Sequence, residues 1–135
     1  MPAIFNKEQE EAITHKEGPL MVLAGPGSGK TLVITYRVKW LIENAGVHPS
    51  NILVITFTRA AAEEMRKRFF AFDGMENAPV TFGTFHSIFF MILRYAYRYT
   101  AGNIIREDVK RRYIKEMTEN MEPVSYTHLT LPTNS

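Results

Sequence analysis

Apolar and polar positions follow one another in blocks along this chain, and the spacing within the blocks changes. Runs of consecutive apolar residues predict buried strands at 20–24, 51–57 and 79–83. Apolar residues that recur every three to four positions predict helices at 5–13, 30–44, 59–72, 88–99 and 106–120. Because strands and helices alternate at this spacing, we expect an α/β fold with a parallel sheet and flanking helices.

Side-chain patterns within the helices predict their caps and faces. Asn6 is expected to cap the first helix, with Gln9 as its capping-box partner. The helix at 30–44 is expected to bury Ile34, Val38, Leu41 and Ala45 and to point Arg37, Lys39 and Glu43 away from that face. On the helix at 59–72, Ala62, Met65, Phe69 and Phe72 are expected to be buried. The exposed side of that helix predicts the ion pairs Glu63–Lys67 and Glu64–Arg68.

The turn after the first predicted strand carries the strongest chemical signal. Its residues, Ala24-Gly25-Pro26-Gly27-Ser28-Gly29-Lys30-Thr31, fit the phosphate-loop pattern G-x-x-x-x-G-K-[ST] with Ala24 at the first glycine position. Glycines let backbone N–H groups turn inward around an anion, and the helix N-terminus attracts negative charge. Lys30 would contact the β- and γ-phosphates of a triphosphate and Thr31 would bind Mg²⁺. The alternative is a glycine-rich turn with an exposed lysine.

Because the strands are expected to be parallel, their carboxyl ends, and the three strand–helix junctions that follow, should lie at one edge of the sheet. Ligands of parallel sheets bind at this edge. The junctions are the phosphate loop, Thr56-Phe57-Thr58, and Gly83-Thr84-Phe85-His86-Ser87. Aromatic faces and small hydrogen-bond donors suit a protein that holds single-stranded nucleic acid without reading its sequence. Core packing of Phe57 and Phe85, and a capping or core role for His86, are the alternatives.

Composition gives only weak evidence on the domain number, partners and location of this protein. A length of 135 residues favours about one domain, and a net charge of +2 permits a polyanionic partner without indicating one. The chain has no cysteine, so disulfides and thiolate metal sites are excluded. No apolar run of about 18 residues occurs, so no membrane segment is expected and a cytoplasmic location is the default. Acidic residues near the end, such as Glu107, Asp108, Glu116 and Glu119, are interpreted as a solvated face.

Four motifs occur in a specific order along the chain. They are Phe5–Gln9, Ala24–Thr31, Ile55–Met65 and Gly83–Ser87. Together they resemble the Q motif, the nucleotide loop and motifs Ia and Ib of UvrD-like DNA helicases of superfamily 1. The resemblance implies a RecA-like phosphate-loop NTPase fold, ATP and Mg²⁺ as cofactors, single-stranded DNA as partner, and 3′ to 5′ translocation that unwinds duplex DNA.

The resemblance also implies roles for individual residues. Gln9 would recognise adenine, although capping its own helix is a competing role. Lys30 and the loop residues Ala24, Gly25, Pro26, Gly27, Ser28, Gly29 and Thr31 would hold the phosphates and the metal. The strand path would be lined by Thr56, Phe57, Thr58, Arg59, His86 and Ser87. Two positions depart from the family pattern, since Leu32 stands where arginine is common and Arg59 where asparagine is common.

The predicted domain boundaries follow from the same resemblance. Residues 1–103 would form part of the ATP-binding domain, and 104–123 the start of an inserted helical subdomain. Residues 124–135 lack acidic residues, lysine and arginine, and the first ten resemble the translation of an adapter used in transposase-based sequencing libraries. We interpret them as a non-native tail, with a natural disordered or strand-like tail as the alternative.

The family's acidic Walker B strand, an apolar run ending in Asp-Glu, does not occur in this sequence. The natural sequence is therefore expected to continue past about Pro123. The chain as written is expected neither to hydrolyse ATP at a useful rate nor to unwind DNA. Two other functions are considered: a small kinase, whose arginine-rich lid the sequence lacks, and a non-catalytic P-loop module that binds nucleotide or nucleic acid. The sequence does not distinguish a role in DNA repair from one in replication or recombination.

Overall fold

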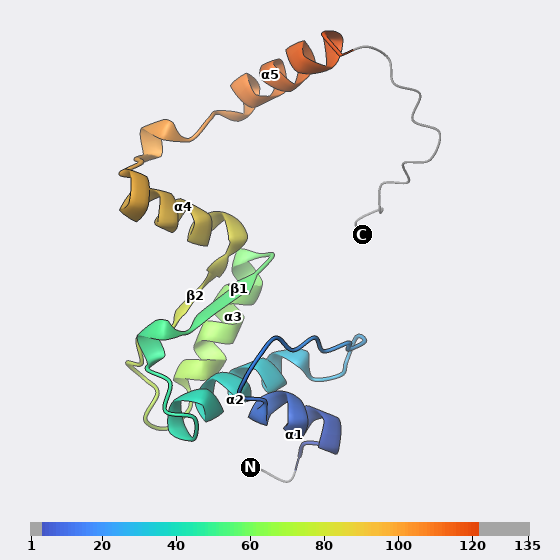
Figure 1. Ribbon diagram of the computed structural model, residues 1–135, viewed down its shortest axis with the longest axis vertical. Coiled ribbons are helices and arrows are strands. Elements are labelled where there is room, and N and C mark those ends of the chain that lie inside the picture. The colour runs from blue at the N-terminus through green and yellow to red at the C-terminus, as the bar shows by residue number, and fades with distance from the viewer. Residues whose placement is uncertain (1–3, 122–135) are drawn as a thin grey trace. The chain divides into compact units, whose positions relative to one another are not determined.

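The computed structural model describes residues 4–121, and Figure 1 shows the elements along the chain. In chain order they are α1 (Lys7–Thr14), α2 (Lys30–Glu43), a 3₁₀ turn (Pro49–Asn51), β1 (Leu53–Thr56), α3 (Arg59–Phe70), β2 (Thr81–Thr84), α4 (Phe85–Tyr97), a second 3₁₀ turn (Ala101–Asn103) and α5 (Glu107–Glu119). The chain divides into two compact units, one ending at Ile92 and the other beginning at Leu93. The predicted boundary at residue 103 stays a prediction.

The sheet of the first unit is parallel, as the alternation of strands and helices predicts. β1 and β2 pair in register, with Leu53 opposite Thr81 and Thr56 opposite Thr84. Both strands therefore end at the same edge, and α3 packs against the two of them (Figure 1). Leu53 is 45% exposed, so β1 is not covered along its whole length as its apolar sequence predicted.

The core of the first unit lies between α2, α3 and the two strands. Phe69 is fully buried at its centre, and its ring lies 5.6 Å from that of Phe82 on β2. The buried members of this cluster are Val38, Ile52, Val54, Met65, Phe69, Met75 and Val80. Ile34 and Leu41 pack against it from α2, and Ala62 is also buried, so the predicted faces of α2 and α3 are confirmed.

The predicted strand at Leu20–Ala24 is wrong for the part of the chain that the structure describes. The segment belongs to no strand, and Met21 and Leu23 are 85% and 91% exposed. An apolar run becomes a strand only when a neighbouring strand takes up its backbone hydrogen bonds. Within residues 4–121, β1 and β2 satisfy each other instead. A mixed α/β fold with a two-stranded parallel sheet is thus established, whereas the full phosphate-loop sheet stays a prediction.

Arg37, predicted to point away from the apolar face of α2, is half-buried against α1, where backbone carbonyls accept its hydrogen bonds. One predicted ion pair in this unit is wrong. Glu63 pairs with Arg66 at 2.8 Å rather than with Lys67, because the i,i+3 guanidinium can bind both carboxylate oxygens. The Glu64–Arg68 pair is confirmed at 2.7 Å.

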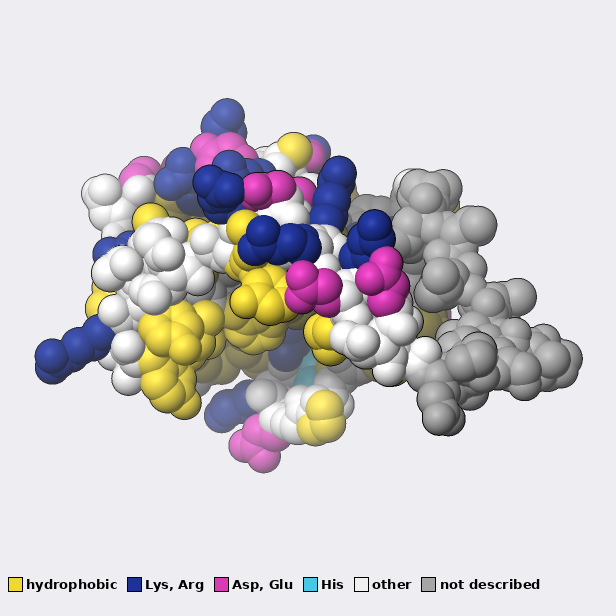
Figure 2. Space-filling view, turned by 90° about the horizontal axis from the view of Figure 1, so that it is seen from above, with side chains coloured by type: hydrophobic (Ala, Val, Ile, Leu, Met, Phe, Trp, Pro, Cys, Tyr) yellow, Lys and Arg dark blue, Asp and Glu magenta, His cyan; other side chains and the backbone are white. Residues whose placement is uncertain are grey.

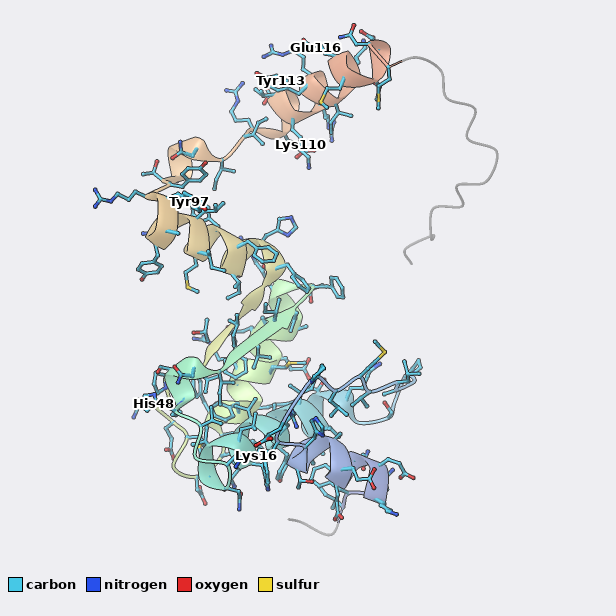
Figure 3. All side chains as sticks on the ribbon, in the orientation of Figure 1. Lys16, His48, Tyr97, Lys110, Tyr113 and Glu116 are labelled. Carbon is cyan, nitrogen blue, oxygen red and sulfur yellow. The ribbon has the colours of Figure 1, made fainter. Side chains whose placement is uncertain are left out.

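The second unit contains α5, an exposed helix that carries both charged and large apolar side chains. Figure 3 labels Lys110, Tyr113 and Glu116 on it, and Tyr113 is 55% exposed. Ion pairs run along the helix, among them Lys115–Glu119 at 3.8 Å. The exposure of Tyr113 and these ion pairs confirm α5 as a solvated, charged helix. Figure 2 shows one face of the molecule, on which basic, acidic and hydrophobic side chains are interspersed.

Two further features are absent from the residues that the structure describes. Among residues 4–121, no group of three or more histidine, cysteine, aspartate or glutamate side chains is arranged to hold a metal ion. None of the described helices is long and apolar enough to cross a membrane. The predicted tail at 124–135 lies outside the described residues.

Candidate nucleotide and nucleic-acid sites

The glycine-rich loop forms the turn that its sequence predicts. Gly27 and Gly29 have φ angles of 75° and 76°, in the left-handed region that favours glycine. Ser28 N–H donates to the Gly25 carbonyl at 3.3 Å, and Gly29 is the N-cap of α2. A Cβ added at Gly25 or Gly27 would meet no atom within 4 Å. The loop therefore places an open turn directly before the N-terminus of a helix of 14 residues.

Two side chains of the loop fit a bound phosphate chain. Lys30 Nζ donates to the Ala24 carbonyl at 3.3 Å, which holds the ammonium group across the loop and leaves it two further N–H donors. The Ser28 hydroxyl is buried and has no hydrogen-bond partner among the described residues. An unpaired buried hydroxyl is costly unless a ligand or water satisfies it. Both observations agree with a loop that is completed by a polar ligand.

Helix α1 contacts the loop through Gln9. The predicted capping box is confirmed, since Asn6 N–H donates to Gln9 Oε1 at 3.0 Å and Gln9 N–H to Asn6 Oδ1 at 2.8 Å. In addition, Gln9 Nε2 donates to the Ser28 carbonyl at 3.0 Å. Gln9 thus caps its own helix and reaches the loop with the same amide, so the capping role and a role at the nucleotide site are compatible.

A cavity of about 490 Å³ lies beside the loop. Its lining combines loop residues with α1, α2 and the extended segment before the loop, and includes Gln9, Leu20, Val22, Ser28, Lys30 and Arg37. Burial lowers the pKa of Arg37 from its ordinary value, as expected for a cation partly removed from water. Arg37 was missed as a site residue because its helical position alone does not show that α1 packs over it.

The second candidate site lies at the ends of β1 and β2 and is aromatic. Phe57 is 90% exposed, and its ring lies 5.4 Å from that of Phe85. Phe85 in turn lies 6.0 Å from Phe89, one turn further along α4. Exposure on this scale excludes core packing for Phe57. Phe89 was not predicted as a site residue, although its i+4 spacing from Phe85 was available as a signal.

The hydroxyl groups at this edge have local hydrogen-bond partners. Thr58 Oγ1 accepts from Ala61 N–H at 3.1 Å and caps α3, and Thr56 Oγ1 donates to the Thr58 carbonyl at 2.8 Å. Ser87 Oγ donates to the Thr84 carbonyl at 3.0 Å and accepts from the Thr84 N–H at 2.9 Å. These bonds fix the two turns, so a DNA phosphate would share these hydroxyls with the backbone.

Charged residues of α3 border the same edge. A cavity of about 480 Å³ is lined by Arg59, Glu63 and Arg66 on α3 and by Gly83 and Ser87 across from them. The hydrogen bond from Arg66 lowers the pKa of Glu63, so this carboxylate stays charged and keeps Arg66 in place. His86, the residue before Ser87, is exposed, which excludes a core role for it.

Gly83 sets how closely α4 approaches β2. A Cβ at this position would lie 2.7 Å from Ser87 Oγ and 2.9 Å from Ile88 Cδ1. Distances below 3.0 Å require one of these atoms to move. The glycine is therefore needed for the tight turn that carries Phe85, His86 and Ser87.

The sequence of this chain is similar to those of known proteins. A sequence model described as the UvrD/REP helicase N-terminal domain matches residues 5–131. YjcD of Bacillus subtilis (strain 168) is 41% identical over 118 residues, which cover 83% of this chain and 16% of that protein. The ATP-dependent DNA helicases PcrA of Staphylococcus epidermidis (strain RP62A) and Staphylococcus aureus (strain Mu50) are 48% and 46% identical over 90 residues. Those 90 residues cover 67% of this chain and 12% of each relative.

The chain spans less than a fifth of the length of these curated relatives. The family match runs past residue 124, where a non-native tail is predicted, and the tail stays a prediction. Since the match covers nearly the whole chain and includes the residues of both candidate sites, this chain belongs to the UvrD/REP helicase family, whose N-terminal domain model it matches.

Proposed function

We propose that the chain is the N-terminal, nucleotide-binding part of an ATP-dependent DNA helicase that moves 3′ to 5′ along single-stranded DNA in the cytoplasm and unwinds duplex. The observation that carries the proposal is the loop at residues 24–31, which joins left-handed glycines, a helix N-terminus and the folded-back Lys30 in one turn. The comparisons support it, because relatives of this chain are named ATP-dependent DNA helicases.

At the nucleotide site, the roles follow from the contacts described above. The loop amides and Lys30 would hold the phosphates, and Ser28 would gain a partner for its buried hydroxyl. Thr31, in the first turn of α2, would bind Mg²⁺, and Gln9 would recognise adenine. Bound ATP would supply the free energy for movement, and the metal would neutralise phosphate charge.

At the sheet edge, the exposed aromatic row would hold single-stranded DNA. Phe57, Phe85 and Phe89 offer ring faces on which bases stack independently of sequence. Arg59 and His86 are exposed beside them and would contact phosphates. A motor must grip the strand without reading it, and this combination of ring faces and positive charge provides that grip.

A non-catalytic nucleotide- and nucleic-acid-binding module is the alternative, and coupling between the two sites distinguishes it. We would measure binding of a labelled oligo-dT by fluorescence anisotropy, with and without a saturating non-hydrolysable ATP analogue at fixed ionic strength. A motor element should change its DNA affinity by about 5–150-fold, the range of typical coupling energies. Lys30→Ala should abolish the change and leave basal DNA binding intact. Equal affinity with and without the analogue would contradict the motor proposal.

A further inference from the structure

We propose that Arg37 is a positioning residue for base recognition: it fixes α1 on α2 so that Gln9 meets the nucleotide loop in one orientation. The proposal rests on the proposed function of the loop as a nucleotide site. It concerns a residue seven positions after Lys30 on α2, which lines the cavity beside the loop and which neither the sequence pattern nor the family match assigns a role.

Arg37 binds the carboxyl end of α1. Its Nη1 donates to the carbonyls of Ala12 and His15, both at 2.7 Å. The last carbonyls of a helix have no partner inside the helix and carry the negative end of its dipole, so a cation there is stabilising. The last turn of α1 contains no basic residue of its own. Arg37 therefore supplies that charge from α2, through two short charge-assisted hydrogen bonds.

The neighbouring residue of α2 holds the other end of α1. Phe5, which precedes the cap residue Asn6, is buried, and its ring packs edge-on against Tyr36 at 4.9 Å. Tyr36 packs in the same manner against Phe72 at 4.8 Å, which connects α1 to the core of the unit. Two adjacent side chains of α2 thus fix both ends of α1, and α1 cannot slide or tilt without breaking one of these contacts.

Gln9 lies between the two anchored ends and is held by its amide. Gln9 Oε1 accepts from Asn6 N–H and Gln9 Nε2 donates to the Ser28 carbonyl, both at 3.0 Å. The two contacts determine which end of the amide is oxygen and which is nitrogen. They leave one lone pair and one N–H for a ligand. This acceptor–donor pair complements the N6 donor and N7 acceptor of adenine, whereas guanine presents acceptors at both O6 and N7.

Arg37 affects the discrimination between adenine and guanine indirectly, through its hydrogen bonds to the backbone of α1. If its hydrogen bonds are removed, the carboxyl end of α1 is free to tilt, and the Gln9–Ser28 contact loses its fixed geometry. The loop itself, with its glycines, its helix N-terminus and the Lys30–Ala24 contact, makes no hydrogen bond to Arg37. Loss of Arg37 should therefore weaken base selection more than phosphate binding.

The experiment compares three competitors for a fluorescent ATP analogue bound to the full chain: ATP, GTP and inorganic tripolyphosphate. In Arg37→Ala, the preference for ATP over GTP should fall about tenfold, the effect of one positioned hydrogen bond, with tripolyphosphate affinity within twofold of the parent. Lys39→Ala is the matched control, since it removes another half-buried cation of α2 that contacts Phe72 and Glu43 instead of α1. Its base preference should not change.

Two further variants keep the proposal falsifiable. Gln9→Ala should lose the base preference, and Arg37→Ala added to it should cause no further loss. Arg37→Lys keeps the cation without the planar guanidinium and should give an intermediate preference, which provides the readout if Arg37→Ala does not fold. The proposal is overturned if Arg37→Ala or Arg37→Lys retains the full preference, or if affinities for ATP and tripolyphosphate fall equally. Failure of the parent chain to bind any competitor would refute the proposed function instead.

Discussion

Truncation of Phe57 separates a binding role from a structural one. The ring is 90% exposed, so Phe57→Ala removes little buried area and should change the free energy of unfolding by no more than about 0.5 kcal/mol. If a base stacks on the ring, the same change should cost about 1–3 kcal/mol of binding free energy. At 1.4 kcal/mol per tenfold, single-stranded DNA should then bind about 5–150-fold more weakly.

The assay is fluorescence anisotropy with labelled oligo-dT at one fixed salt concentration, because phosphate contacts make the affinity depend on salt. Tyr113→Ala is the matched control, since Tyr113 is also an exposed aromatic residue but belongs to α5 of the second unit, outside the candidate DNA site. It should leave DNA binding within twofold. Phe69→Ala, which empties a fully buried site, should instead cost about 3–5 kcal/mol of stability. Unchanged DNA affinity in a folded Phe57→Ala variant would refute the stacking argument, as would an equal loss in Tyr113→Ala.

Two further predictions concern the sheet edge. Gly83→Ala should destabilise the chain by about 1–3 kcal/mol in urea unfolding, because its Cβ would lie 2.7 Å from Ser87 Oγ. Gly102→Ala, whose Cβ would lie at an ordinary 3.6 Å from the nearest side-chain atom, should be close to neutral, and equal effects would contradict the packing argument. The lowered pKa of Glu63 means that its pairing with Arg66 stabilises the fold above the unfolded-state pKa of glutamate and is lost as pH falls through the lower folded-state value. The difference in melting temperature between the parent and Glu63→Gln should accordingly vanish in acid; a difference that persists there would exclude the ion pair as its cause.

Local sequence predicted most of the helices correctly because their signals are local. The apolar spacing of Ile34, Val38 and Leu41 already defined the buried face of α2, and Asn6 with Gln9 defined the start of α1. The strand expected at residues 20–24 failed for the opposite reason. Its stability depends on a partner strand, and an apolar run does not show whether a partner is present.

At the candidate sites too, features set by local sequence were predicted, whereas features that depend on other parts of the fold were not. The turn of Gly27 and Gly29 followed from the loop pattern, since few other sequences place left-handed glycines before a helix. The buried side of Arg37 did not follow, because it depends on α1 folding back over α2 from more than 20 positions away in the sequence. The local partners of Ser87 and Thr58 were also missed, because hydroxyls that suit phosphates equally suit caps.

The central claim, that the loop at residues 24–31 binds nucleoside triphosphate, is tested most directly by titrating a fluorescent ATP analogue into the parent chain and Lys30→Ala. Lys30 is the only side-chain cation in the loop, and its Nζ is held across the loop by the Ala24 carbonyl. We expect the parent to bind the analogue, Lys30→Ala to lose binding, and Lys39→Ala to bind as the parent does. Unchanged affinity in a folded Lys30→Ala variant would contradict the assignment of this loop as the nucleotide site.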